Sequence, residues 1–230
     1  MRQRLLFAAS VYFAYACACV ACATATRDTF DSDGGADAAK DRAVLGPAET
    51  GPFDDGGLDD GGACGTKVVI NELMTGTPDA SQAEFIELYN PGGCAVPMSD
   101  WKLSYRASTG TLGPPLLTFP IGSSIAAKSY LVAAREQFPG KSDVMLTGGS
   151  MAADNGQVAL LDDMGKVIDG VGYGVIEAGA GDGSTYVEKQ PAPSPPSGGS
   201  IARHPNGVDT DDNKTDFVQQ ATHSAGAENP

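Results

Sequence analysis

The chain has 230 residues, which leaves room for one domain with tails or at most for two small domains. It carries 29 aspartates and glutamates against 15 lysines and arginines, and its formal net charge at pH 7 is −14. Because the basic residues from Lys67 to Lys214 are scattered singly, this pattern excludes a surface along which nucleic-acid phosphates could bind.

The first 22 residues have the layout of a secretory signal peptide. Arg2 and Arg4 are followed by an apolar run from Leu5 to Cys22, and the segment ends in small residues. We therefore expect residues 1–22 to direct export. A retained transmembrane anchor is the alternative, although an apolar run of this length barely spans a bilayer.

The end of this segment resembles a bacterial lipobox, in which a small residue precedes the cysteine that becomes acylated. Residues 20–22, Val-Ala-Cys, fit best, although Cys19 stands where leucine is expected. The resemblance implies lipidation of Cys22 and a location in the bacterial cell envelope, at the outer membrane or the cell surface. Acyl chains would then anchor the protein without spanning the membrane. Cys17 and Cys19 stay open as competing sites, as does cleavage slightly later without a lipid.

Residues 23–63 are predicted to form a disordered linker. Residues 27–63 hold ten acidic residues against three basic ones, and the near-repeat FDDGG and LDDGG adds glycines. Such a composition buries too little apolar surface to offset the entropy of ordering. Repulsion between the like charges would extend the linker, so we expect it to hold a domain at residues 64–230 away from the membrane.

Two cysteines remain outside the export segment. Cys64 precedes the first apolar run of the domain, and Cys94 follows the second. In an oxidising compartment such a pair is a disulfide candidate. Antiparallel pairing of the two runs would place the cysteines near opposite ends of a hairpin, so two free thiols remain the alternative.

From residue 66 onward, short apolar runs alternate with turn residues. Their length and their content of Val, Ile, Leu and Tyr are typical of an all-β sandwich or barrel. The clearest hairpin is residues 157–173, and residues 123–138 are predicted to form a strand around Leu131 with at most a helical turn near Glu136. The proline-rich stretch 190–200 is interpreted as a covering loop, with an extended ligand for a partner as the alternative. The predicted strands are residues 67–73, 84–90, 101–105, 116–119, 129–134, 157–162, 166–174 and 200–203.

The residues from 66 to 229 resemble the lamin tail domain in its bacterial form. The motifs that carry the resemblance are VVINEL, EFIELYNPGG, SDWKL, FPIGSSI, SYLVAA, GQVALLDDMGKVIDGVGYG, SIARHPNGVDTDDNKTDF and the closing Ala-Gly-Ala-Glu-Asn, in this order. The resemblance implies an immunoglobulin-like β-sandwich in a secreted or surface protein. It does not imply a ligand, because function depends on sites rather than on folds.

A polar motif interrupts the first two predicted strands. Side chains alternate along a strand, so Glu87 shares a face with aromatic residues of the run 84–90. The family has a glutamate here and an Asn-Glu pair in the preceding strand, which correspond to Glu87 and to Asn71 and Glu72. A buried carboxylate needs a partner, and Asn71, Trp101 or a loop amide could serve Glu87. We interpret the motif as structural, with a binding role or a catalytic carboxylate pair as alternatives.

A second polar stretch, residues 204–217, contains a candidate metal site. Asp209, Asp211 and Asn213 alternate as in calcium-binding loops, but Lys214 and Gln220 stand where an EF-hand has Gly and Glu. Aspartates and asparagines that cap their own backbone in a turn explain the same pattern. The calcium site and the structural turn therefore both stay open.

The chain shows no motif of an enzyme. A nucleophile elbow, a phosphate loop and zinc-ligand spacing are absent from the sequence. We therefore expect a non-catalytic cell-envelope protein without a cofactor, whose domain is a surface interaction or scaffold module for an envelope protein or polysaccharide. A calcium-dependent binding module is the alternative, and an envelope hydrolase or an accessory domain of one is less favoured. The sequence identifies neither the partner nor the oligomeric state.

Overall fold

The computed structural model describes residues 67–77, 79–177 and 185–230. The expected signal peptide, the lipidation site Cys22, the acidic linker and Cys64 lie outside these residues. The expected Cys64–Cys94 disulfide therefore stays a prediction.

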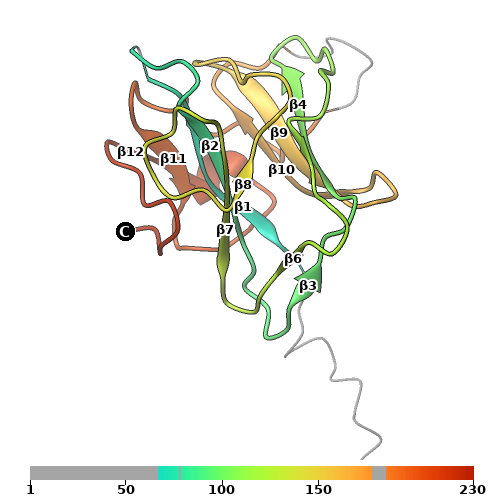
Figure 1. Ribbon diagram of the computed structural model, residues 1–230. Helices are drawn as coiled ribbons and strands as arrows, with labels where there is room; N and C mark the ends of the chain where they lie inside the picture. Colours follow the sequence, from blue (N-terminus) through green and yellow to red (C-terminus); the bar gives the residue numbers. More distant parts are fainter. Residues whose placement is uncertain (1–66, 78, 178–184) are drawn as a thin grey trace, which may run out of the picture. The chain divides into compact units, whose positions relative to one another are not determined.

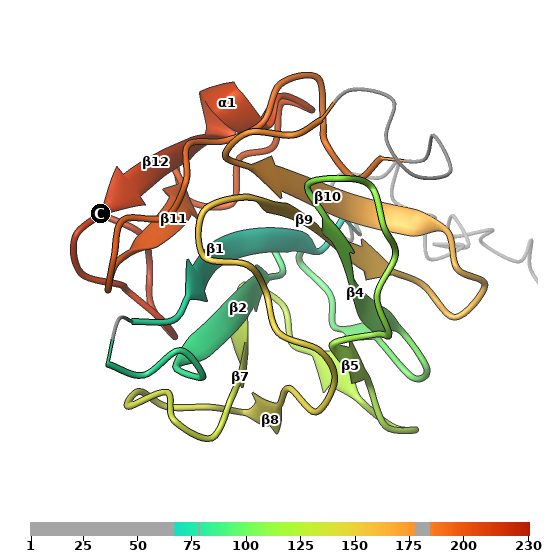
Figure 2. The same ribbon diagram turned by 90° about the horizontal axis from the view of Figure 1, so that it is seen from above.

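The described part of the chain is a sandwich of two main sheets (Figures 1 and 2). The first sheet has the strand order β12-β11-β1-β2-β7-β8 and the second the order β10-β9-β4-β5, while β3 and β6 form a small third sheet. Neighbouring strands are antiparallel, except that β7 and β8 are parallel. The strands are β1 (Val69–Thr75), β2 (Glu84–Tyr89), β3 (Val96–Pro97), β4 (Lys102–Ala107), β5 (Leu117–Thr118), β6 (Ser124–Ile125), β7 (Tyr130–Ala134), β8 (Val144–Met145), β9 (Gly156–Leu161), β10 (Val167–Tyr173), β11 (Ser200–Arg203) and β12 (Phe217–Gln220).

The main core lies between the two large sheets. Ile86 and Leu88 of β2 pack there with Leu103 of β4, Val158 of β9 and Val171 of β10, and all five are fully buried. This arrangement follows from the period of two along a strand, which sends alternate side chains to the core.

The other face of the six-stranded sheet carries a second apolar group. It consists of Met74, Phe85, Val132, Ala134 and Phe138, and we call it the outer apolar cluster. Phe85 and Val132 alternate with core residues on β2 and β7, which places them on the outward side. Figures 1 and 2 place the C-terminus beside β11 and β12, and residues 221–230 beyond β12 contribute Ala225 to this cluster. We call these ten residues the C-terminal strap.

The predicted all-β class is confirmed, and each predicted strand corresponds to an observed one. The hairpin of β9 and β10 turns at Asp162–Gly165. Residues 123–138 form β6 and β7 and end in a single hydrogen-bonded turn around Glu136, in which Phe138 N donates to Arg135 O at 3.0 Å. Strand β12, the short strands β3, β6 and β8, and helix α1 (Asn213–Asp216) were not predicted.

The proline-rich stretch is the covering loop that the sequence predicts. Ala192 lies beside Tyr173, and its backbone hydrogen-bonds to Gly172 and Gly174 at the edge of β10. The four residues of α1 are the only helix in the described part of the chain, and no described helix is long and apolar enough to cross a membrane.

Candidate functional site

A bulge in β1 organises the polar residues of the domain. Ile70 and Leu73 both belong to the main core, although a regular strand would send residues three apart to opposite faces. The pairing with β2 shifts between Ile70 and Glu72, so Asn71 is the extra residue. Asn71 and Glu72 consequently both point to the outer face, where β2 presents Glu87.

Strand β11 pairs with only part of β1. Its register pairs Ala202 with Glu72, and the chain leaves the sheet after Arg203. Side chains replace the missing strand at Ile70: its N–H donates to Asp169 Oδ2 at 2.6 Å, and its carbonyl accepts from Arg203 Nε at 2.9 Å. A buried backbone group without a partner would cost free energy, so these two side chains complete the sheet.

Arg203 is fully buried and is surrounded by carboxylates. Its Nη2 lies 3.0 and 3.1 Å from the two oxygens of Asp169, and its Nη1 lies 2.7 Å from Asp216 and 3.2 Å from Asp209. The guanidinium also lies over the ring of Phe217, 4.7 Å from the centroid. The side chain thus connects β1, β10 and α1 through charge-assisted hydrogen bonds.

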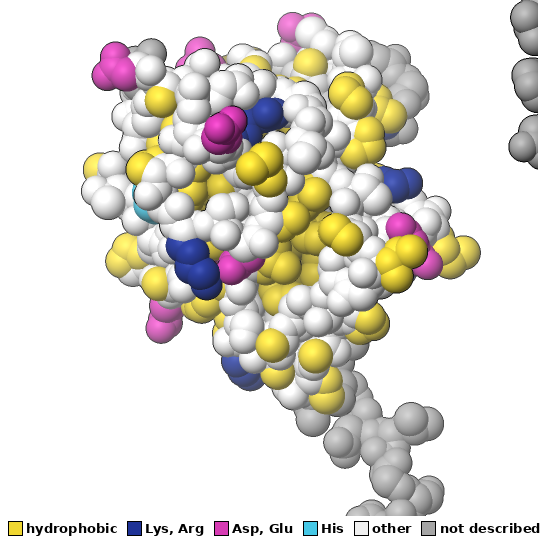
Figure 3. Space-filling view, viewed as in Figure 1, with side chains coloured by type: hydrophobic (Ala, Val, Ile, Leu, Met, Phe, Trp, Pro, Cys, Tyr) yellow, Lys and Arg dark blue, Asp and Glu magenta, His cyan; other side chains and the backbone are white. Residues whose placement is uncertain are grey.

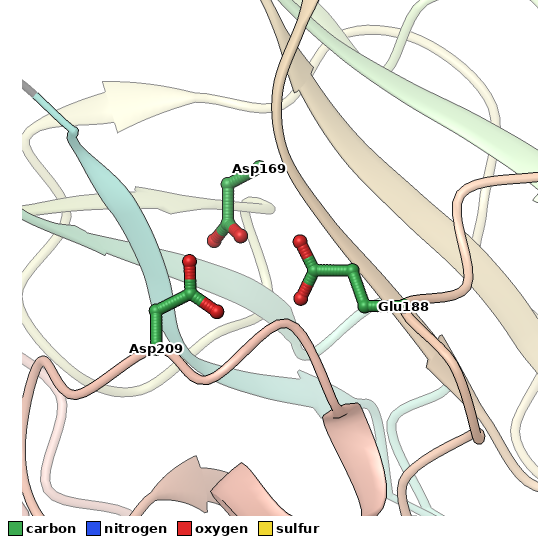
Figure 4. Close-up of side chains that lie close together, drawn as sticks. All are labelled: Asp169, Glu188 and Asp209. Atoms are coloured by element: carbon green, nitrogen blue, oxygen red, sulfur yellow. The ribbon is translucent and has the colours of Figure 1, made fainter.

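Three carboxylates meet beside Arg203. Figure 4 shows Asp169, Glu188 and Asp209 pointing toward one another, and one oxygen from each lies within 4.8 Å of the others. Lys67 forms an ion pair with Asp209 and, at 3.3 Å, with Asp211. Two cations of the chain therefore already compensate much of this negative charge.

The pKa values of the three carboxyls differ with their surroundings. Burial, together with the charges of Asp169 and Asp209, raises the pKa of Glu188 to about 8. Burial also raises the pKa of Asp169, against the opposing effect of Arg203. For Asp209 the hydrogen bond from Lys67 and the charge of Arg203 outweigh burial and lower the pKa. Glu188 is thus the group that holds a proton at neutral pH.

The three residues of the predicted calcium site do not form one set of ligands, because Asp209 and Asp211 share the ammonium group of Lys67 whereas Asn213 binds other groups. Asn213 Oδ1 accepts hydrogen bonds from Gly172 N at 2.9 Å and Glu188 N at 3.0 Å, so both of its lone pairs are used. Asp211 is exposed, while the side chain of Asp209 is only 7% exposed and lies in the Arg203 cluster. The turn has the structural role that the sequence analysis left open, and calcium binding stays a prediction without support from Asn213.

The structure brings Asn71, Glu72 and Glu87 together as the sequence predicts. Glu72 and Glu87 lie directly opposite each other on β1 and β2. Asn71 Nδ2 donates to Glu87 Oε1 at 2.8 Å, which confirms one of the expected partners. The other partner is also a loop amide, because Gly226 N of the C-terminal strap donates to Glu87 Oε2 at 2.5 Å.

The strap also covers Glu72. Ser224 N donates to both oxygens of Glu72 at 3.0 and 3.1 Å, and Ser200 Oγ donates to Oε1 at 2.5 Å. Asn229 Nδ2 donates to the carbonyls of Asn71 at 3.2 Å and Arg203 at 3.0 Å. In the sequence, the strap is visible only as the end of the family pattern, and this role was not predicted.

Burial under the strap raises the pKa of Glu87 to about 7. The hydrogen bonds from Asn71 and Gly226 oppose this rise, whereas the nearby charges of Glu72 and Asp143 add to it. Two carboxylates face each other here without a cation among the partners that hydrogen-bond to them. At neutral pH Glu87 therefore exchanges between its protonated and its charged form.

The buried carboxylates share one pattern, in which donors of the same domain hydrogen-bond to them. Glu84 accepts from Arg135 Nε at 2.6 Å and from Met151 N at 3.0 Å, and it follows the same pattern as Glu72 and Glu87. Two surface hollows are lined by residues other than these carboxylates. One, of about 200 Å³, lies around Thr75 and Asp154, and the other, of about 450 Å³, lies around Pro193 and Val218.

These features define the class of the protein as an immunoglobulin-like β-sandwich held by buried ionic ties. Residues 63–175 match the family model of the Lamin Tail Domain, so this part of the chain belongs to a lamin tail domain. The resemblance in the sequence is thereby confirmed for this part of the chain. No curated protein matches the chain. The folded domain continues beyond the matched residues, because β11 and β12 complete the sheet that contains β1.

Proposed function

We propose that this protein is a non-catalytic cell-envelope protein of bacteria, in which a lipid-anchored acidic tether carries a lamin tail domain that acts as a surface interaction or scaffold module. The observation that carries the proposal is the internal pairing of the buried carboxylates. Glu72, Glu87 and Asp169 each accept hydrogen bonds from donors of the same domain, so these carboxylates are not directed at a substrate.

The surface of the domain supports contact through loops. Ile121, Met164 and Val175 are large apolar residues that lie in loops and are exposed. Figure 3 shows further apolar side chains gathered in a hollow of one face, with acidic and basic side chains scattered around it. Apolar residues that stand singly on a surface are ordinary, whereas a contiguous apolar patch supports a role in binding a protein or another ligand.

The anchor is tested by replacing the predicted acylation site. Cys22→Ser should abolish incorporation of labelled palmitate and shift the protein from the membrane fraction to the secreted fraction, while Cys17→Ser and Cys19→Ser serve as matched controls. Loss of labelling in a control instead of in Cys22→Ser would move the site. Absence of labelling in the wild type would overturn the lipid anchor.

The surface location is tested by treating intact cells with protease. The domain should be released from intact cells, and a marker inside the cell should stay protected. Cross-linking before lysis should then recover a defined envelope partner with the wild-type domain. Protection of the domain in intact cells but not in lysed cells would place it on an inner face of the envelope and contradict a surface role.

A further inference from the structure

The C-terminal strap lies over an apolar surface of the six-stranded sheet. Ala225 packs on the outer apolar cluster, and the ring of His223 lies 5.3 Å from that of Phe85 and 5.0 Å from that of Phe138. The strap has no regular secondary structure and lies beyond the last strand. Removing it from the sheet would expose the cluster without breaking a strand pair.

The strap is held largely through two carboxylates. Its backbone N–H groups at Ser224 and Gly226 donate to Glu72 and Glu87, and Asn229 adds contacts to the backbone of β1 and β11. Glu72 and Glu87 face each other across two strands, an arrangement in which two negative charges repel. Water stabilises both charges when the strap is away, whereas the docked strap excludes water from them.

We propose that the C-terminal strap is a proton-linked latch, which stays docked on the outer apolar cluster while Glu87 holds a proton and is released when Glu87 loses it. Release uncovers an apolar surface on β1, β2 and β7. This latch goes beyond the proposed function, because it does not depend on the anchor or on the location of the protein.

The sign of the linkage follows from the burial of Glu87. Burial raises its pKa to about 7 with the strap docked, and exposure to water on release brings the pKa back toward the ordinary value of 4.5. Docking therefore takes up a proton between these two pH values, and it weakens as the pH rises through this window and levels off above it. The same two values imply that the docking equilibrium falls by roughly 70-fold between pH 5 and pH 8.

Other groups near Glu87 that can carry charge bear on this sign. They are Glu72 on β1, Tyr89 on β2, Tyr130 on β7, Asp143 after β7, and His223 and Glu228 on the strap. Only His223 among them can become positive.

Hydrogen exchange of the full-length chain measures the latch directly. Protection factors of peptides from the strap, corrected for the intrinsic dependence of exchange on pH, should fall by one to two orders of magnitude from pH 5 to pH 8. Peptides from β9 should keep constant protection. A flat profile for the strap, or a rise in its protection with pH, would overturn the proposal.

Two variants assign the effect to its group. Glu87→Gln should make protection of the strap independent of pH, and this slope is the readout because glutamine also loses one acceptor for the strap. Glu228→Gln removes the same charge from an exposed position on the strap and should leave the slope unchanged. A flat slope in Glu228→Gln, or a wild-type slope in Glu87→Gln, would contradict the assignment to Glu87.

Discussion

Replacement of Arg203 by methionine tests the role of the buried ionic cluster. Arg203 is fully buried, and its main partners Asp169 and Asp216 are 1% and 3% exposed. Removing one partner of a buried ion pair costs about 3–5 kcal/mol, because the other charge stays buried and unpaired. Proteins of ordinary stability have free energies of unfolding of about 5–15 kcal/mol, so the variant should lose about a fifth or more of this free energy.

Urea unfolding followed by tryptophan fluorescence measures this loss. Trp101 is the only tryptophan and packs against the main core, so its emission reports on the domain. Lys166→Met is the matched control, because it removes the same charge from an exposed turn and should change the free energy of unfolding by no more than about 0.5 kcal/mol. The midpoint of thermal unfolding of Arg203→Met should fall by about 10 °C.

A second substitution separates the ion pair from the volume of the side chain. Asp169→Asn removes the charge but keeps an oxygen for the N–H of Ile70. The double variant with Arg203→Met should therefore be less destabilised than the sum of the two single variants, with a coupling of about 1–3 kcal/mol. A loss below about 1 kcal/mol in Arg203→Met, or strictly additive single variants, would refute the view that the cluster supports the fold.

Three further outcomes are expected. The midpoint of thermal unfolding should be the same with excess calcium as with a chelator, because cations of the chain already pair with Asp209. A rise of several degrees with calcium that Asp209→Asn abolishes would instead support the predicted calcium site. Glu188→Gln should gain stability relative to the wild type as the pH rises from about 4.5 to about 8, since the pKa of Glu188 is raised in the folded state; a constant difference across this window in urea unfolding would contradict it. Peptide mapping without reduction should link Cys64 to Cys94, and Cys64→Ser should lower the free energy of unfolding by about 3 kcal/mol; an unchanged value would leave the pair without a structural role.

Local patterns predicted most of the strands. The alternation in residues 84–90 placed Glu87 on the face opposite Ile86 and Leu88, and the structure confirms this assignment. The hairpin of β9 and β10 was equally visible, because two apolar runs flank a short turn. These features depend on the nearest neighbours along the chain, which a single sequence contains.

The composition of the charged clusters could not be predicted in the same way. Asp169, Glu188 and Asp209 are separated by many residues, and only the pairing of the sheets and the loops after β10 brings them together. Asp169 did give a signal, since it is a carboxylate inside an apolar run, as Glu87 is. The strands of two residues, such as β8, are too short for any alternation to appear.

The bulge at Asn71 connects the two clusters and explains why both contain carboxylates. Apolar core residues stand at positions 68, 70 and 73, and the change of spacing from two to three marks the bulge in the sequence. On one side of it, Ile70 lacks a strand partner, so Asp169 and Arg203 supply the hydrogen bonds. On the other side, Asn71 and Glu72 turn outward together, where the side chains of a regular strand would alternate.

A buried carboxylate on the outer face of a central strand needs hydrogen-bond donors. The backbone N–H groups of the neighbouring strands already bond within the sheet, so the donors must come from a covering segment. The C-terminal strap meets this need, since its irregular backbone leaves the N–H groups of Ser224 and Gly226 available to Glu72 and Glu87. The free energy needed to detach such a strap from the outer face is smaller than that needed to detach a strand, because the strap lacks a continuous ladder of backbone hydrogen bonds. The polar motif of β1 and β2 thus stabilises the sandwich and also makes one of its faces open to regulation by protons.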